Sequence, residues 1–226
     1  MALNEHLDRF VKVLSSYGGR DKAMRTLYYA LMMYSSQQKD RDLAARIMLM
    51  AKQFSAARLM GRRFNDFPMV QASRDLLASK NEPDRKSYYL RLATTLLYTI
   101  YGPIEHIAWL SDLKFIRTNG RWWYYCVMIW AAALSFSIAR SARAYFKLVM
   151  KRVELDTDDR DAVRRVAEQE FEELLTLGQL LSDFMNAINF LPPGILWSQT
   201  FSQWRVGTFG FIASFLGFVK LYRAAK

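Results

Sequence analysis

Side chains that bind metals or form disulfides are scarce in this sequence. One cysteine, Cys126, and two histidines, His6 and His106, occur among its 226 residues. They lie too far apart in the chain to give the ligand spacing of a zinc site. A single thiol cannot form a disulfide within one chain. The first residues also lack a basic stretch followed by an apolar one, so we expect no secretory signal.

Motifs of common catalytic sites are also missing. The sequence contains no G-x-x-x-x-G-K-[ST] phosphate loop and no G-x-S-x-G nucleophile elbow. Glu105 and His106 are adjacent, but neighbours on a helix point about 100° apart, which is poor geometry for a catalytic dyad. We therefore expect a protein that is not an enzyme and needs no cofactor or metal.

Acidic residues are outnumbered by basic ones, 21 against 32, which gives a formal net charge of +11. Such a charge favours nucleic acid or an anionic membrane surface as a partner. Hydrophobic residues make up 52% of the chain and aromatic residues 15%, a composition that argues against disorder. The choice between the two partners depends on how the apolar residues are arranged.

Residues 122–139 form a run of 18 residues without a charge, between Arg121 and Arg140. As a helix it would be about 27 Å long, close to the hydrocarbon thickness of a bilayer. The run opens with four aromatic residues, which are typical of the headgroup level. A buried helix of a soluble protein is the alternative. The length and the flanking arginines favour a membrane span, and so a membrane rather than nucleic acid.

Two shorter apolar runs accompany it. Residues 92–104 are interrupted by Gly102-Pro103, which predicts a buried, re-entrant or interfacial helix. Residues 206–219 would cover about 21 Å, so we expect a second span near residues 204–222 only with help from flanking aromatic residues or local thinning of the bilayer. Glycines in this run offer a surface for close helix contact, or equally are merely tolerated in a membrane helix. They are Gly207, Gly210 and Gly217.

Helical periodicity extends over nearly the whole chain, so the predicted fold is all-α, an integral membrane helical protein with two spans. We expect Gly18-Gly19 to end the first helix and Asp21 to cap the second. The polar residues 79–87 read as a linker. The sequence thus predicts a single domain, residues 1–226, with an amphipathic helical region over 1–87 and a membrane region over 88–226.

Residues 43–65 contain five basic residues and no acidic one. At about 100° per residue, apolar side chains gather on one side of this helix and most basic ones lie away from it. The pattern is typical of a helix in the headgroup plane, or equally of a helix in a soluble bundle. The predicted membrane-contact residues are Arg46, Ile47, Met50, Lys52, Phe54, Arg58, Arg62 and Arg63.

A second basic stripe follows the predicted span. Its members recur at intervals of three and four residues and so share one helical face. They are Arg140, Arg143, Lys147 and Lys151. We expect this face to contact anionic lipid headgroups where the helix leaves the membrane; a merely solvated face is the alternative.

Three ordered motifs resemble the peroxisomal membrane protein 11 (peroxin-11) family, gamma-type. The first is Gly19-Arg20-Asp21-Lys22, followed by Arg25 and Tyr29. The second comprises Tyr98, residues 101–109 (YGPIEHIAW) and residues 121–123 (RWW). The third comprises Asp183, residues 186–188 (NAI), residues 191–197 (LPPGILW, with Pro192, Pro193, Gly194 and Trp197) and residues 204–207 (WRVG, with Trp204). One departure is residues 200–203, where relatives often carry proline before the tryptophan.

The resemblance implies a multi-pass protein of the peroxisomal membrane, with both termini in the cytosol, that elongates the organelle before fission and promotes peroxisome proliferation. It implies that an amphipathic helix, matching about residues 43–77 here, inserts into the cytosolic leaflet and bends it. It also implies homo-oligomers and recruitment of fission factors, namely a dynamin-like GTPase and its membrane adaptors. Overall charge agrees with cytosolic termini, whereas the charges immediately beside residues 122–139 favour a cytosolic middle loop.

Two other functions remain open at this point. Polar and glycine residues near 206–219 could line an oligomeric pore for small metabolites. A soluble helical adaptor is disfavoured by the uncharged run. For membrane remodelling, we expect an aspartate at Ile47 or Phe54 to abolish elongation of the organelle and to leave the protein in the membrane.

Overall fold

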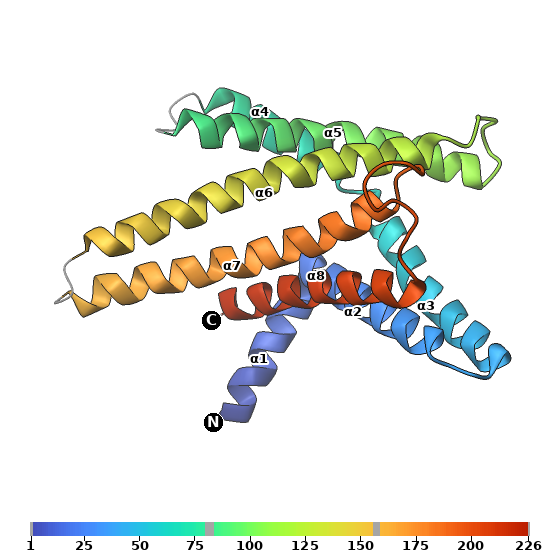
Figure 1. The fold of residues 1–226 in the computed structure, drawn as a ribbon, viewed down its shortest axis with the longest axis horizontal. Coiled ribbons are helices and arrows are strands. Elements are labelled where there is room, and N and C mark those ends of the chain that lie inside the picture. The colour runs from blue at the N-terminus through green and yellow to red at the C-terminus, as the bar shows by residue number, and fades with distance from the viewer. Residues whose placement is uncertain (1, 80–83, 156–158, 226) are drawn as a thin grey trace. The chain divides into compact units, whose positions relative to one another are not determined.

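The computed structural model describes residues 2–79, 84–155 and 159–225, and every regular element within them is an α-helix (Figure 1). The all-α prediction is confirmed. The helices, in chain order, are α1 (Ala2–Ser15), α2 (Tyr17–Ser36), α3 (Arg41–Arg62), α4 (Asp66–Ala78), α5 (Arg85–Asp112), α6 (Trp122–Glu154), α7 (Arg160–Asn189) and α8 (Gln203–Ala224).

The start of α2 differs from the prediction. Ser16 caps α2, and its hydroxyl accepts a hydrogen bond from the Gly19 amide at 3.0 Å, so both glycines lie inside the first turn. A Cβ on Gly19 would lie 2.0 Å from the carbonyl oxygen of Val13, whereas one on Gly18 would meet nothing within 4 Å. Gly19 is therefore needed for the close approach of α1 and α2, and not as a helix stop.

The apolar run around Gly102-Pro103 also differs from the prediction, because α5 continues through Pro103 without a break. Gly102 lies close to α4, since a Cβ there would come within 2.1 Å of a carboxylate oxygen of Asp66. His106 also contacts Asp66, at 3.3 Å. The segment is therefore one long helix that packs against α4 through its middle.

The chain forms two compact units. The first comprises residues 1–60, 174–183 and 201–226, and the second comprises residues 61–173 and 184–200. The units do not follow the predicted boundary at residue 87 between an amphipathic and a membrane region, which stays a prediction, because α8 and part of α7 pack with the N-terminal helices. Such long-range packing cannot be read from local composition.

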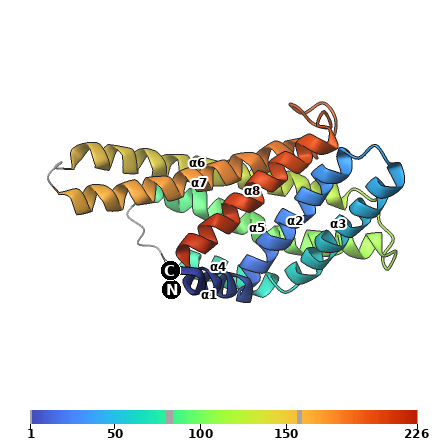
Figure 2. The ribbon, with the colours of Figure 1, turned by 90° about the horizontal axis from the view of Figure 1, so that it is seen from below.

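In the first unit, α8 lies antiparallel to α2 (Figures 1 and 2). The glycine face of α8 makes this contact: added Cβ atoms would meet Met33 at Gly207, the Tyr29 ring at Gly210, and Lys22 and Gln179 at Gly217. The predicted small-residue surface is thus used for a close helix contact within the chain.

In the second unit, α5 and α6 lie side by side and α4 packs on α5 (Figure 1). The α6 side chains buried in the fold are small or medium-sized and include Cys126, Ala133 and Leu134. Larger ones such as Tyr124, Met128 and Phe136 are exposed. Helix α6 thus presents bulky apolar groups outward, as expected of a helix in contact with lipid.

Candidate membrane-surface site

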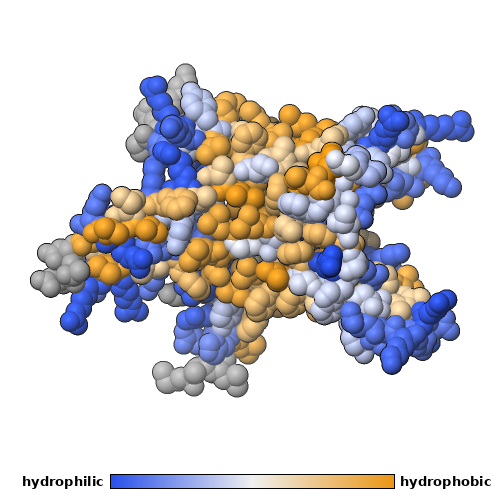
Figure 3. Space-filling model, viewed as in Figure 1, coloured by the Kyte–Doolittle hydropathy of each residue, from blue (hydrophilic) through white to orange (hydrophobic). Residues whose placement is uncertain are grey.

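Within the described residues, one helix is long and apolar enough to cross a membrane: α6, Trp122–Glu154. Its 33 residues would extend about 50 Å, so the helix continues well beyond the predicted span 122–139. Figure 3 shows apolar side chains over the middle of α5 and α6. Helix α8 covers the second predicted span but does not meet the same test, so that span stays a prediction.

The apolar side chains of α3 do not all gather on one face. Ile47 is only 8% exposed and Ala51 is fully buried, whereas Leu49 is 62% exposed and Met50 and Met60 are 50% exposed. The prediction that Ile47 and Met50 share a membrane-contact face is therefore wrong for Ile47, which packs inside the first unit. Phe54, also in the predicted set, is half-buried.

Arg58 is another predicted contact residue that faces inward. Its Nε donates a hydrogen bond to Asp21 Oδ1 at 2.9 Å, and both side chains are nearly buried. Asp21 thus pairs with α3 instead of capping α2. In this arrangement Arg58 fixes α3 against α2 and does not face a membrane surface.

Arg62 and Arg63 meet a buried carboxylate in the second unit. Each donates to one oxygen of Glu105 at 2.7 Å, and the Tyr101 hydroxyl donates to the same carboxylate at 2.7 Å. The Arg63 guanidinium also lies 5.5 Å from the centre of the Trp109 ring, at cation–π distance. Burial and the Glu105 charge raise the pKa of Tyr101, so its hydroxyl stays protonated and able to donate.

Arg46 and Lys52 are the predicted basic residues that do lie exposed on α3. They accompany a solvent-facing set at intervals of three and four residues. That set is Ala45, Leu49, Met50, Gln53, Ala56, Ala57 and Met60. We call these seven residues, with Arg46 and Lys52, the outer face of α3. It contains large apolar groups that are half-exposed or more, with two exposed cations beside them.

Arg25 of the first motif pairs with Asp183 of the third. Two hydrogen bonds join the guanidinium to the carboxylate, and both side chains are buried. Burial alone would lower the pKa of Arg25, but Asp183 and Tyr29 outweigh it and raise the pKa. Nearby Lys22 is half-buried, and its pKa is lowered by desolvation and by Arg25.

The other motif residues serve local structure. Arg20 donates to the carbonyls of Leu14 and Ser15 at the end of α1. Trp197 donates to the Met185 carbonyl at 2.9 Å, which ties the loop after Pro192-Pro193 to α7, and Gly194 adopts a left-handed φ of 98°. Trp204 is partly exposed at the start of α8.

The basic stripe on α6 is on the surface, as predicted. Arg140, Lys147 and Lys151 are exposed and Arg143 is half-buried. Sequence spacing did not reveal the carboxylate beside them: Asp84 accepts hydrogen bonds from Arg143 and Lys147. Whether the stripe contacts lipid stays a prediction.

The geometry therefore assigns several motif positions to internal ion pairs, and comparison with known proteins identifies the family. Residues 7–222 match the model of the family described as "Peroxisomal biogenesis factor 11 (PEX11)". The chain belongs to the PEX11 family. The resemblance stated from the three motifs is confirmed, and the family consists of peroxisomal membrane proteins involved in peroxisome biogenesis.

Two curated relatives are similar over almost their whole length. Peroxisomal membrane protein 11C of Mus musculus is 28% identical over 231 residues, which cover 97% of this chain and 96% of the relative. Peroxisomal membrane protein 11C of Homo sapiens is 29% identical over 232 residues, which cover 97% and 95%. No solved structure matches the chain.

Proposed function

We propose that this protein resides in the peroxisomal membrane and elongates it before the organelle divides. It has no catalytic role in this proposal. Helix α6 anchors it, and the outer face of α3 inserts into the cytosolic leaflet as a wedge. The observation that carries the proposal is the exposure of Leu49, Met50 and Met60 on one solvent-facing side of α3, next to Arg46 and Lys52.

The energetics favour a lipid surface for this side of α3. Full transfer of a large apolar side chain out of water contributes about 1.5–3 kcal/mol, and these three side chains are each about half exposed, so together they supply a few kcal/mol. Each cation near an anionic surface adds about 1 kcal/mol. A helix held in this way sits about 5–10 Å deep at the boundary between headgroups and acyl chains, where it expands one leaflet and bends the membrane.

Contact between the two ends of the chain supports an even number of crossings, and family membership supports the cytosolic side for both termini. Helices α2 and α8 pack together although α6 lies between them in the sequence. The side chains of His6 and Tyr222, near the two ends of the chain, form a hydrogen bond. This hydrogen bond supports both ends lying on one side of the membrane, which requires an even number of crossings, and we assign the crossing that follows α6 to α8.

Self-association and recruitment of a dynamin-like GTPase with its membrane adaptors complete the proposed role. Family membership supports both. Self-association would add the curvature of many wedges along one tubule, and recruited GTPases would then cut the elongated membrane.

The test is imaging of the tagged full-length chain against a peroxisomal marker, with organelle length scored. We expect the wild-type chain to co-localise and to lengthen the organelles. Leu49→Asp with Met50→Asp should abolish lengthening while the protein stays in the carbonate-resistant membrane fraction. The matched control is Leu7→Asp with Val11→Asp, two residues of similar exposure on α1. Equal lengthening by the Leu49/Met50 variant and the wild type would contradict the wedge.

The alternative, an oligomeric pore for small metabolites, loses its main argument. The glycine residues expected to line it contact Tyr29, Met33 and Lys22 of α2. Conductance of purified protein in planar bilayers would revive the pore.

A further inference from the structure

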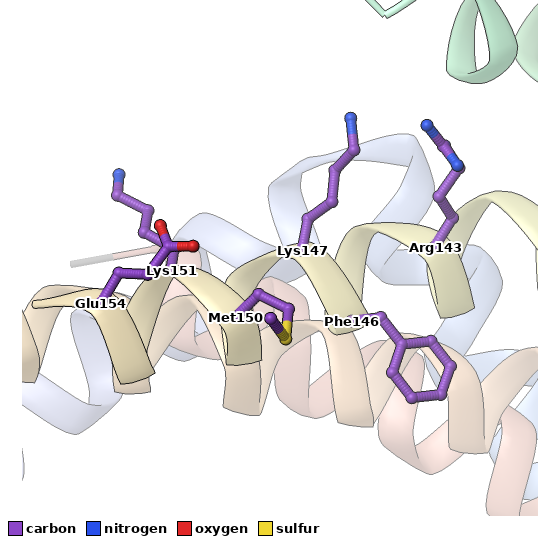
Figure 4. Close-up of a pocket in the computed structure, with 6 residues that line it drawn as sticks. All are labelled: Arg143, Phe146, Lys147, Met150, Lys151 and Glu154. Carbon is purple, nitrogen blue, oxygen red and sulfur yellow. The ribbon is translucent and has the colours of Figure 1, made fainter.

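An open groove lies along the part of α6 that follows the predicted span. Its volume is about 550 Å³. The residues that line it are Arg143, Phe146, Lys147, Met150, Lys151 and Glu154 (Figure 4). In Figure 4 the cationic ends of Arg143, Lys147 and Lys151 point to the same side of the helix, and Phe146 and Met150 lie lower along it. The groove therefore offers a row of cations above a row of apolar groups, with the Glu154 carboxylate beside Lys151 at one end.

The two apolar residues of the groove, Phe146 and Met150, are largely exposed. Phe146 is 66% exposed and Met150 is 59% exposed, although neither belongs to the uncharged run. The opposite side of the same segment is in use, because Ser141 donates to Glu173 and Arg152 pairs with Glu170 of α7. The apolar row thus stays largely uncovered by protein within the described chain.

Asp84 shows what kind of group the cations accept. Its carboxylate receives hydrogen bonds from Arg143 at 3.2 and 3.3 Å and from Lys147. The hydrogen bonds from Lys147, Ser87 and Arg143 lower the pKa of Asp84 well below its usual range, so it is ionised at neutral pH. A phosphate presents the same negatively charged oxygens and suits the fork of an arginine.

We propose that this groove binds one anionic phospholipid, its phosphate among Arg143, Lys147 and Lys151 and its glycerol on Phe146 and Met150, with the acyl chains directed back along α6 toward the uncharged run. Continuity with the span selects a lipid as the occupant: Arg143 lies about one helical turn beyond residue 139, at headgroup depth. The inference rests on the proposed membrane placement of α6 and is independent of the wedge on α3.

Asp84 competes with the lipid in this arrangement, since it occupies two of the three cations. Its replacement by asparagine removes the competing charge and keeps a side chain that can cap α5, where Asp84 is the N-cap. Asp84→Asn should therefore strengthen lipid binding.

Native mass spectrometry of the full-length protein in neutral detergent tests the site. The probes are dioctanoyl phosphatidic acid, dioctanoyl phosphatidylcholine and inorganic phosphate. We expect the wild type to bind the phosphatidic acid at least tenfold more tightly than the other two, and Asp84→Asn to bind it several-fold more tightly still. Arg143→Gln with Lys147→Gln and Lys151→Gln should weaken that binding at least tenfold.

The matched control removes the same charge from exposed cations at the start of α7, by Arg160→Gln with Arg164→Gln and Arg165→Gln, and should bind as the wild type does. Phe146→Ser should weaken binding of the lipid. If the control variant lost as much affinity for phosphatidic acid as the groove variant does, binding would depend on overall charge, and the site would be overturned. Equal affinity of the wild type for inorganic phosphate and for phosphatidic acid would also overturn it. Loss of a dimer peak in the groove variant with unchanged lipid binding would assign the groove to a second copy instead.

Discussion

Arg25 of α2 and Asp183 of α7 form a buried, doubly hydrogen-bonded ion pair across 158 residues of sequence. The pair joins the first and third family motifs inside one unit. A buried pair of this kind gives little net stability by itself, but removal of one partner leaves the other charge buried without compensation. The motif residues therefore specify how α2 and α7 meet.

Asp183→Ala should lower the free energy of unfolding by about 3–5 kcal/mol, because it strands the Arg25 guanidinium in the interior. Thermal unfolding of the purified protein in detergent measures the loss. Arg25→Met combined with Asp183→Leu should recover much of it. Glu168→Ala breaks the exposed pair with Arg164 and should cost less than about 1 kcal/mol. Equal costs for Asp183→Ala and Glu168→Ala would contradict the account.

Gly18 and Gly19 are adjacent in the sequence, but only Gly19 lies in the close contact between α1 and α2. Gly19→Ala forces a methyl group against the Val13 carbonyl, so we expect a loss of about 1–3 kcal/mol of stability. Gly18→Ala has open space and should be neutral or stabilising by up to about 1 kcal/mol, since alanine favours the helix. The same melting assay compares them, and a loss of similar size in both variants would exclude the close approach of α1 and α2.

Glu105→Gln should loosen the end of α3 from α5. The substitution removes the charge that holds Arg62 and Arg63, and an amide cannot replace both charge-assisted hydrogen bonds. Hydrogen exchange should quicken in residues 58–66 and 100–108 and stay unchanged in α8. Uniformly unchanged exchange would mean that Glu105 does not hold this junction.

The span itself can be tested by cysteine labelling in intact organelles, with Cys126→Ala as the background. Met128→Cys replaces a side chain 41% exposed outside the fold, so it should resist a membrane-impermeant maleimide in the bilayer and react after detergent extraction. Lys151→Cys lies beyond the span and should react without detergent extraction. It should react in intact organelles if it faces the cytosol, and after permeabilisation if it faces the organelle interior. Reaction of Met128→Cys in intact and permeabilised organelles, without detergent extraction, would show that α6 is a helix of a soluble bundle.

Charge distribution made part of this architecture predictable. The uncharged run between Arg121 and Arg140 indicates the core of α6. The spacing of the four basic residues that follow indicates that they share one helical face: Arg140, Arg143, Lys147 and Lys151. The glycines of α8 indicated a close helix contact. Each of these signals is local, because a helix converts sequence spacing directly into a shared face.

The orientation of α3 was less predictable for a physical reason. Periodicity shows which side chains share a face but not which face packs inward, and α3 carries apolar residues on both sides: Ile47 inside, Leu49 and Met50 outside. Its arginines resemble headgroup contacts in the sequence because their carboxylate partners, Asp21 and Glu105, are remote in the chain. A carboxylate within an apolar segment, as at Glu105, is the signal that could have indicated an internal partner.

The most direct test of the central claim is the depth of α3 in a bilayer. The purified chain, with Cys126→Ala and a fluorescent label on Leu49→Cys, is reconstituted into vesicles that contain anionic lipid, and quenching by nitroxides on the acyl chains is compared with quenching by aqueous iodide. We predict strong acyl-chain quenching at Leu49 and weaker quenching for a label on Lys52→Cys. A Leu49 label quenched only from the aqueous phase would contradict insertion of α3.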